Sequence, residues 1–283
     1  MTAGGGLVAR PDSTLVDRAL LALAGGARPA DWLATHVMGL QRAPELVAER
    51  LAIALLGADP RAHRLADGRW SLVAAASGAP LLEECAFAVV DVETTGVRAT
   101  RDDRITEIAV VLVQGERREL VFESLVNPGR PIPGFCTALT GITNEMLRAA
   151  PRFEDIAEPV LEALSGRAFV AHNVRFDWRF VAAELRRTRA VRLDGPRLCT
   201  VRLARRLLPS AESCSLGALG FQLAFDNPAR HPAGGDALVT AMLLQRLLGL
   251  ARETGARTLV DLELLQLGRP RARKRRRRPP PLA

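Results

Sequence analysis

Four carboxylates and one histidine lie where apolar segments end, and together they could hold cations and transfer a proton. They are Asp91, Glu93, Asp177, His231 and Asp236. The first two lie two residues apart in the run AFAVVDVE, so on a strand both would point to the same face. The two acids of such a pair repel each other and lose hydration on burial. The arrangement is therefore unfavourable unless a cation compensates the charge. Hard divalent ions prefer oxygen ligands, so this spacing predicts a metal site.

Each of these residues also has a plainer interpretation when it is taken alone. A D-x-E pair is common on surface strands, and an acid in the first turn of a helix, such as Asp177, complements the helix dipole. Asp236 could be only a helix cap, and a histidine in a loop rich in proline and glycine is more often an exposed bystander than a catalyst. The order and settings of all five residues together favour catalysis.

A neutral imidazole, with an ordinary pKa of about 6.5, is suited to removing a proton near neutral pH. His231, in the segment HPAGGD, is the candidate for this general base. His172 is the alternative. It adjoins an expected buried strand, where a structural hydrogen bond is the more common role for a histidine.

The part of the chain that carries the acids has the pattern of an α/β domain, expected over residues 84–252. Strands are predicted at 86–93, 104–114, 119–127 and 168–173, and helices at 141–150, 151–166, 175–187, 199–208, 215–224 and 235–251. Strands that first meander and then alternate with helices predict a mixed sheet flanked by helices. Residues 253–268 predict a C-terminal extension.

The segment 12–73 predicts a small helical accessory domain in front of this part. Helices are expected over 13–23, with Ser13 as N-cap, over 31–40 and over 44–56, and the segment 63–73 predicts a hairpin around Asp67 and Gly68. This order fits either a winged helix or a helical packing domain. Residues 1–11 are rich in glycine and are expected to be flexible, and residues 74–83 predict a linker.

The net charge of +8 belongs to the tail rather than to the body of the chain. The disordered tail expected over residues 269–283 holds eight basic residues and no acid, which leaves 31 basic and 31 acidic residues in positions 1–268. No uncharged apolar run approaches the roughly 18 residues of a membrane helix. The four cysteines are widely spaced, which favours a reducing, cytoplasmic setting over a disulfide or zinc framework.

Three segments, VVDVETTG, HNVRFDWRF and HPAGGDA, resemble in order and spacing the three motifs of the DEDDh exonucleases. That family includes the proofreading epsilon subunit of bacterial DNA polymerase III, ribonuclease T and oligoribonuclease. Residues 125–151 resemble the family's segment between its first and second motifs, and the resemblance extends from about residue 86 to 251. It implies a ribonuclease-H-like fold with a mixed five-stranded sheet, and stepwise 3′→5′ hydrolysis that releases nucleoside 5′-monophosphates.

The resemblance also implies roles for the five residues. Asp91, Glu93 and Asp236 would hold one Mg²⁺ or Mn²⁺ ion, Asp91 would bridge to a second ion, and Asp177 would hold the shell of that second ion mostly through water. His231 would take a proton from the attacking water. Two divalent ions suit this chemistry, because they serve both the attacking and the departing oxygen of an in-line displacement.

Further residues are implied to contact the substrate. The candidates are Thr94, Thr95, Val97, Thr140 and His231. The first three follow the D-x-E pair and resemble positions that meet the terminal nucleotide, and Thr140 stands where some relatives place a substrate-contacting histidine. Phe135 stands where the epsilon subunit has a substrate-touching acid. Phe176 and Trp178, which flank Asp177, are interpreted as core residues rather than as stacking platforms.

The sequence therefore predicts a metal-dependent 3′→5′ exonuclease that acts on single-stranded or frayed 3′ ends. DNA is favoured because of the winged-helix-like neighbour, with proofreading or repair as the role, a DNA polymerase or a replication or repair complex as partner, and no membrane association. One alternative is an RNA-trimming or oligonucleotide-degrading exoribonuclease, since sugar discrimination depends on the pocket around the 2′ position. Another is a non-catalytic nucleic-acid-binding or polymerase-anchoring module. Such a module would be expected to lack one of the five residues, and none is missing.

Overall fold

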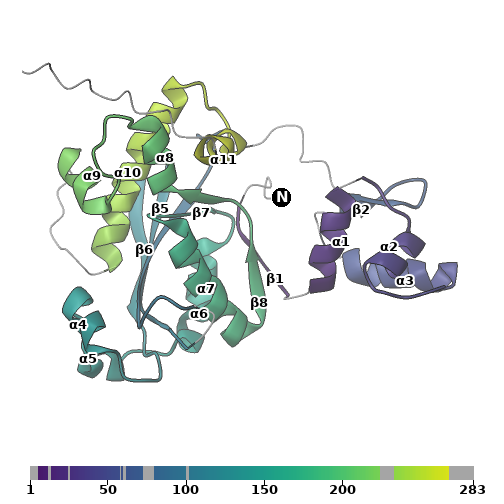
Figure 1. Ribbon diagram of the computed structural model, residues 1–283, viewed down its shortest axis with the longest axis horizontal. Coiled ribbons are helices and arrows are strands. Elements are labelled where there is room, and N and C mark those ends of the chain that lie inside the picture. Colours follow the sequence, from purple (N-terminus) through teal and green to yellow (C-terminus); the bar gives the residue numbers. More distant parts are fainter. Residues whose placement is uncertain are drawn as a thin grey trace, which may run out of the picture. The chain divides into compact units, whose positions relative to one another are not determined.

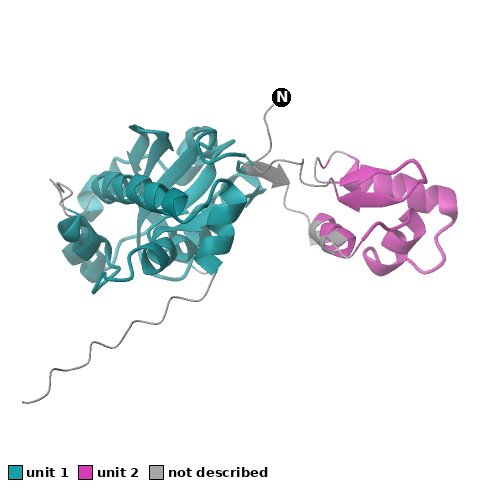
Figure 2. Cartoon of the chain, turned by 90° about the horizontal axis from the view of Figure 1, so that it is seen from above, with its two compact units in different colours: residues 1–10, 79–283 teal, residues 11–78 magenta. Residues whose placement is uncertain are grey.

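The computed structural model describes residues 6–11, 14–24, 26–57, 59, 62–72, 80–99, 102–223 and 233–267. The chain divides into two compact units, one made of residues 1–10 and 79–283 and the other of residues 11–78 (Figure 2). The candidate acids all belong to the larger unit.

A five-stranded mixed sheet forms the centre of the larger unit (Figure 1). Its strands in spatial order are β6 (Arg117–Leu125), β5 (Ile105–Gln114), β4 (Phe87–Thr94), β7 (Ala168–Ala171) and β9 (Arg197–Cys199). The first three form an antiparallel meander, whereas β4, β7 and β9 run parallel to one another. The predicted ribonuclease-H-like mixed sheet is therefore confirmed. The apolar pattern of the sequence did not predict strand β9, because three residues are too few to show the alternation of a strand.

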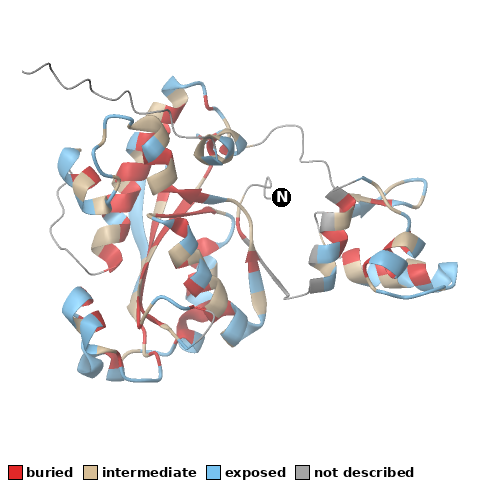
Figure 3. Cartoon of the chain, in the orientation of Figure 1, coloured by how far each residue is buried: buried red, intermediate tan, exposed pale blue. Residues whose placement is uncertain are grey.

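Helices cover both faces of this sheet. Successive strand residues point to opposite faces, so Phe87 and Val89 pack against α8, α10 and α11, while Ala88 and Val90 pack against α6 and α7. Burial is concentrated on β4, β5 and β7 and on the helices packed against them, whereas β6 is largely exposed (Figure 3). The helices of this unit are α4 (Gly134–Thr140), α5 (Asn144–Arg148), α6 (Phe153–Leu164), α7 (Val174–Arg189), α8 (Thr200–Leu207), α9 (Leu216–Gln222), α10 (Ala233–Glu253) and α11 (Leu259–Leu267).

The N-terminal segment corrects one prediction, because residues 6–11 are ordered against the larger unit. Leu7 is 1% exposed, its N–H donates to the carbonyl of Arg167, and β1 (Val8–Pro11) pairs with β8 (Val191–Asp194). Gly6 allows this docking, because a Cβ at that position would lie 1.9 Å from the carbonyl carbon of Gly166. Gly6 therefore allows the N-terminal segment to lie close to the backbone of Gly166, and flexibility is not its role here.

The end of the predicted linker also belongs to the larger unit. Leu82 is 3% exposed in the core beside α10 and α11, and its N–H donates to the carbonyl of Arg257. Leu262 of α11 lies in the same core, so the segment 253–268 contributes to this unit through α11. Residues 73–79 lie outside the described residues, so the rest of the linker stays a prediction.

The smaller unit contains α1 (Thr14–Ala24), α2 (Ala30–His36), α3 (Glu45–Leu56) and the hairpin of β2 (Ala62–Arg64) and β3 (Trp70–Leu72). The hairpin is confirmed, with Gly68 at a positive φ of 85° in its turn. Helix α2 ends at His36, before the predicted limit of residue 40, and Gly39 follows at a φ of 76°. The winged-helix interpretation stays a prediction, and Ser13, its predicted N-cap, lies outside the described residues.

Candidate active site

Asp91 and Glu93 lie in the second half of β4, the central strand of the sheet, where the strand becomes accessible. Both side chains are half-buried, while their neighbours Val92 and Thr94 are buried, so the two acids share one face as predicted. This is the face that carries Phe87 and Val89 and is covered by α10. Along this one face, β4 therefore carries apolar core residues in its first half and the acids of the site in its second half.

Asp177 approaches from the first turn of α7, the helix that follows β7. Its side chain is 4% exposed, and backbone N–H groups of Val92 and of Asp177 itself donate to its carboxylate. Asn173, just before the helix, adopts a left-handed conformation at a φ of 81°, which asparagine tolerates better than most residues. The turn from β7 into α7 therefore directs Asp177 toward the end of β4.

Asp236 lies in the first turn of α10 and is half-buried. It lies within electrostatic reach of both Asp91 and Glu93, because its charge contributes to the raised pKa of each. The structure thus brings four predicted acids from three elements into one region. His231 and its loop lie outside the described residues, so its role stays a prediction.

Two further acids, Glu107 and Glu123, belong to the same region and were missed by the motif comparison. Glu107 of β5 lies opposite Glu93 in the strand register, is buried, and accepts a hydrogen bond of 2.9 Å from the N–H of Ala233. Glu123 of β6 lies against Gly234, where a Cβ would be 2.0 Å from the Glu123 Oε1 atom. Both acids thus contact the N-terminus of α10, where negative charge is stabilised by the helix dipole. An acid within the apolar run RITEIAVVLVQ was the available signal for Glu107.

Crowding raises the proton affinity of these carboxyl groups. Burial raises the pKa of Asp91 well above its usual range, with further contributions from Asp177, Asp236, Glu93 and Glu107 in that order. Burial and the charges of Glu107 and Asp236 raise the pKa of Glu93 to about 7. The pKa of Asp177 is also raised, chiefly by burial, and its two backbone hydrogen bonds oppose the rise. These carboxylates repel one another and need a compensating positive charge to ionise together.

The donor chemistry of this region fits hard divalent cations, which take carboxylate oxygen ligands. Among the described residues, no three His, Cys, Asp or Glu side chains are already gathered closely enough for a metal cage. Coulomb interactions reach farther than coordination bonds, so the acids can raise one another's pKa without sharing a coordination sphere.

His172, the alternative base, has both ring nitrogens engaged. Nδ1 lies 2.9 Å from the Thr200 hydroxyl and Nε2 lies 2.9 Å from the Cys214 carbonyl. A carbonyl only accepts, so Nε2 carries the proton and donates, and Nδ1 accepts from the hydroxyl. Burial lowers the pKa of the ring. This histidine therefore fastens β7 to neighbouring segments, as the sequence context suggested.

The predicted substrate contacts differ in accessibility. Val97 is 68% exposed, whereas Thr94 and Thr95 are buried. The Thr94 hydroxyl donates to the Gly96 carbonyl at 2.6 Å, and the Thr95 hydroxyl accepts from the Arg104 N–H at 3.0 Å. The Thr140 hydroxyl donates to the Cys136 carbonyl and accepts from the Ile142 N–H. The three threonines thus shape the backbone around the site, and Val97 presents a free side chain.

Helix α4 adds an exposed apolar surface beside the acids. Phe135 is 66% exposed, and its neighbour Cys136 lies within electrostatic reach of Glu93 and Asp103, which contribute to the raised pKa of its thiol after burial. An exposed phenylalanine next to a polar site offers a flat surface for a base or sugar. In the sequence, Phe135 is distinguished only by standing where the epsilon subunit has a substrate-touching acid.

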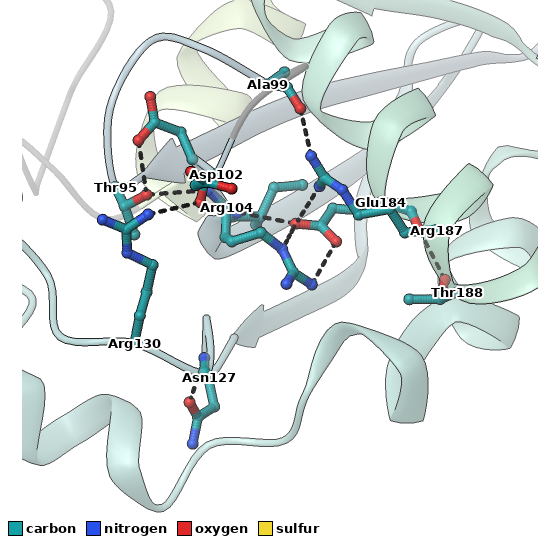
Figure 4. A network of polar contacts seen from close by, with 12 residues as sticks. Thr95, Ala99, Asp102, Arg104, Asn127, Arg130, Glu184, Arg187 and Thr188 are labelled. Carbon is teal, nitrogen blue, oxygen red and sulfur yellow. Dashed lines mark hydrogen bonds and ion pairs between the residues drawn. The ribbon is translucent and has the colours of Figure 1, made fainter.

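A buried ion pair fixes the loop after β4 to helix α7 (Figure 4). Arg104 donates two hydrogen bonds, of 2.6 and 2.8 Å, to the carboxylate of Glu184, which is 1% exposed. The Arg104 backbone is also hydrogen-bonded to Thr95, and Arg187 lies 3.4 Å from the same carboxylate. Glu184 lies two helical turns after Asp177, so the network positions the helix that carries one acid against the loop that follows two others.

A mixed sheet with acids at the end of its central strand, and a further acid in the helix after β7, defines a ribonuclease-H-like nuclease domain. The family model described as "RNase_T: Exonuclease" matches residues 88–244, which is more than half of the chain. The chain belongs to this exonuclease family, and the DEDDh resemblance of its sequence is confirmed.

Several curated relatives are similar to this chain. DNA polymerase III subunit epsilon of Aquifex aeolicus is 33% identical over 162 residues, which are 57% of this chain and 80% of that protein. The 3′-5′ exonuclease DinG of Bacillus subtilis is 37% identical over 179 residues, and the subunit epsilon-like protein of Rhodobacter capsulatus is 40% identical over 184. These two matches take in 63% and 62% of this chain, but only 19% and 26% of those longer proteins.

Among solved structures, exonuclease X in complex with 5′-overhanging duplex DNA is similar over 64% of this chain and 99% of that chain. The sequence identity is 28% and the TM-score is 0.52. In the described part of this chain, every helix is too short or too polar to cross a membrane.

Proposed function

We propose that this protein is a metal-dependent 3′→5′ exonuclease that releases nucleoside 5′-monophosphates from DNA ends. The observation that carries the proposal is the convergence of Asp91, Glu93, Asp177 and Asp236 at the end of β4 in an exonuclease-family fold. DNA as the substrate is supported by the DNA bound to exonuclease X and by the polymerase III names of the relatives.

In this proposal the four acids would hold two divalent ions, Mg²⁺ or Mn²⁺, which would supply charge neutralisation for the hydrolysis of a phosphodiester. Asp91 and Glu93 from β4, Asp177 from α7 and Asp236 from α10 provide oxygen ligands from three directions. The raised pKa values mean that these carboxyl groups release protons when positive charge arrives.

The remaining residues act on water and on the nucleotide. His231 takes one proton from the attacking water, whose oxygen forms the new bond to phosphorus, and the bond from phosphorus to the 3′ oxygen breaks. Val97 and Phe135 contact the terminal nucleotide through apolar surface, which does not depend on base identity. The backbone held by Thr94 and Thr95 shapes the pocket for the 3′ end.

Proofreading or repair, with a DNA polymerase or a replication or repair complex as partner, is the proposed context. It is supported by the relatives named as DNA polymerase III subunits. The smaller unit adds no support for DNA, because it has seven arginines and seven acids, and Arg64 of its hairpin is paired with Glu49 of α3 at 2.9 Å. A cytoplasmic location is part of the proposal and suits four cysteines that are free thiols.

The test offers the purified full chain matched single-stranded and duplex DNA and RNA, labelled at either end, with Mg²⁺ or with EDTA. We expect 5′-monophosphates released stepwise from 3′ ends of DNA only when Mg²⁺ is present. Faster release from RNA would establish the exoribonuclease alternative instead. Binding without any cleavage would establish the non-catalytic module.

Variants of the site sharpen this test. Asp91→Ala and Asp236→Ala should each abolish Mg²⁺-dependent degradation while the protein stays folded, since each removes an oxygen ligand. His231→Ala should lose most turnover, by about 10²- to 10⁴-fold, but keep metal binding, which calorimetry with Mn²⁺ can measure. His172→Ala, at the alternative base, is the variant with which His231→Ala is compared. Undiminished turnover in Asp91→Ala would refute the assigned site.

A further inference from the structure

A cavity outside the candidate active site lies on the flank of α7 away from Asp177. Its volume is about 390 Å³, and three elements supply four arginines to it, Arg175 and Arg179 from α7, Arg197 from β9 and Arg202 from α8. Glu263 of α11 is the one acid among the lining residues. The cavity therefore carries a clear excess of positive charge, in a body that has no net charge over residues 1–268.

Two of the four guanidinium groups in this cavity, those of Arg197 and Arg179, are oriented by the protein. Among the described residues, none of the four forms an ion pair with a carboxylate, although Glu263 accepts a hydrogen bond from the Arg197 backbone and lies within electrostatic reach of the Arg197 charge. Arg197 stacks on the ring of Trp178 at 4.7 Å. Arg179 donates through Nε to the Arg175 carbonyl at 2.8 Å. The remaining N–H groups of these two side chains have no acceptor among the described residues and are suited to an external anion.

The walls of the cavity are themselves fixed. Trp178 packs edge-on against Phe169, with ring centroids 5.2 Å apart, so its position is set by the core. Gln266 of α11 spans the edge strand β9, since it accepts from the Cys199 N–H at 2.9 Å and donates to the Arg197 carbonyl at 2.7 Å.

We propose that this cavity binds the sugar-phosphate backbone of a nucleic-acid strand as a second, non-catalytic contact of the exonuclease domain. Forked guanidinium groups recognise phosphate oxygens with paired hydrogen bonds, and four of them match successive phosphates better than a single small anion. A base is not the recognised group, because Arg197 already lies over the Trp178 ring. The inference rests on the proposed exonuclease function for its choice of ligand.

The position of the cavity fits a strand that also enters the candidate active site. Residues 174, 175, 178 and 179 face the cavity, and Asp177 lies on another side of the same helical turns. The two sites are therefore separated by about the diameter of a helix, on the order of 10 Å. A strand with its 3′ end at the acids can extend past α7, whereas a dinucleotide is too short to engage both sites.

The test measures binding separately from cleavage. A labelled long single strand of DNA is titrated with the full chain in EDTA, for the wild type and for the double variant Arg197→Ala/Arg202→Ala. The control is Arg117→Ala/Arg246→Ala, which removes two exposed arginines of the same unit outside the cavity. We expect roughly tenfold weaker binding in the cavity variant only, and a salt dependence of the binding constant reduced by about 0.7 per lost phosphate contact.

Further measurements distinguish strand binding from the binding of a small anion and from a loss of folding. With Mg²⁺, the cavity variant should degrade a dinucleotide at the wild-type rate and show a raised KM only for the long strand. Arg202→Ala alone, whose guanidinium has no described partner, repeats the test if the double variant unfolds. Equal binding by cavity and control variants would overturn the proposal, as would tight binding of inorganic phosphate or a mononucleotide with no gain from strand length. A chain that binds in EDTA but never cleaves would refute the exonuclease function and leave the cavity's role intact.

Discussion

At the scale of single residues, the site is defined by the cost of placing like charges together. Asp91, Glu93 and Asp177 all have a raised pKa, and burial is the first cause for each. The folded chain therefore binds more protons than the unfolded chain from about pH 4, the ordinary carboxyl value, up to about pH 8, the value for Asp177. In this window the metal-free protein becomes less stable as the pH rises, because raised carboxyl pKa values contribute stability that is lost on ionisation.

Replacing one of these acids by its amide should therefore stabilise the metal-free protein at high pH. In EDTA at about pH 8, we expect Asp91→Asn to raise the melting temperature by about 2–4 °C, which corresponds to roughly 1 kcal/mol. Below about pH 4 the difference should disappear, because the wild-type carboxyl is then protonated in the folded and in the unfolded chain alike. Thermal unfolding at both pH values measures this effect. Glu116→Gln, an exposed acid in the β5–β6 turn, is the control, and a pH-independent gain in Asp91→Asn would contradict a charge effect.

At the scale of elements, the acids are positioned by contacts that the motifs do not contain. Glu107 anchors the start of α10, and Glu184 joins α7 to Arg104 at the start of β5. A buried charge that loses its partner is left without compensation, so such a pair is costly to break. The orientation of Asp177 and Asp236 thus depends on residues well outside the three motifs.

Breaking the buried pair should be more damaging than breaking an exposed one. We expect Glu184→Gln to lower the free energy of unfolding by about 1–3 kcal/mol, because the arginines left behind, Arg104 and Arg187, are each about a third exposed and keep part of their hydration. Glu119→Gln, which breaks the exposed pair with Arg117, should cost about 0–1 kcal/mol. Denaturant unfolding of both variants gives the comparison. The double variant Arg104→Leu/Glu184→Leu should recover part of this loss. Equal losses in Glu184→Gln and Glu119→Gln would show that the buried pair stabilises the protein no more than the exposed pair.

How far the sequence predicts these elements depends on their length and burial. The long strands β4, β5 and β6 and the helices α6, α7 and α10 show clear apolar periods, and the family motifs place their acids. Strand β9 and the pairing of β1 with β8 could not be predicted, because short segments take their structure from their neighbours. Gly6 is an example. In the sequence, a glycine needed for close approach cannot be told from a flexible one, and only the structure shows the backbone of Gly166 packed against it. The cavity arginines come from segments far apart in the sequence and share no motif.

At the scale of the whole molecule, positive charge is distributed unevenly. Residues 1–268 have no net charge, the cavity on α7 gathers four arginines, and eight further basic residues follow directly after Gly268. The candidate active site is acidic and would repel a phosphate chain in the absence of cations. Capture of the substrate is therefore expected to depend on basic groups that take no part in hydrolysis.

The basic tail should act on capture and leave catalysis unchanged. Deleting residues 269–283 removes eight charges that can each release a counterion from a bound single strand, so the salt dependence of binding should fall by up to about 6. Steady-state kinetics at low salt should show a raised KM and an unchanged kcat, because a saturated active site no longer benefits from long-range attraction. A variant with all eight basic residues replaced by glutamine keeps the length and separates charge from chain length. If kcat falls in either variant, the tail contributes to the chemical step. If KM does not change, the segment is only a solvated extension.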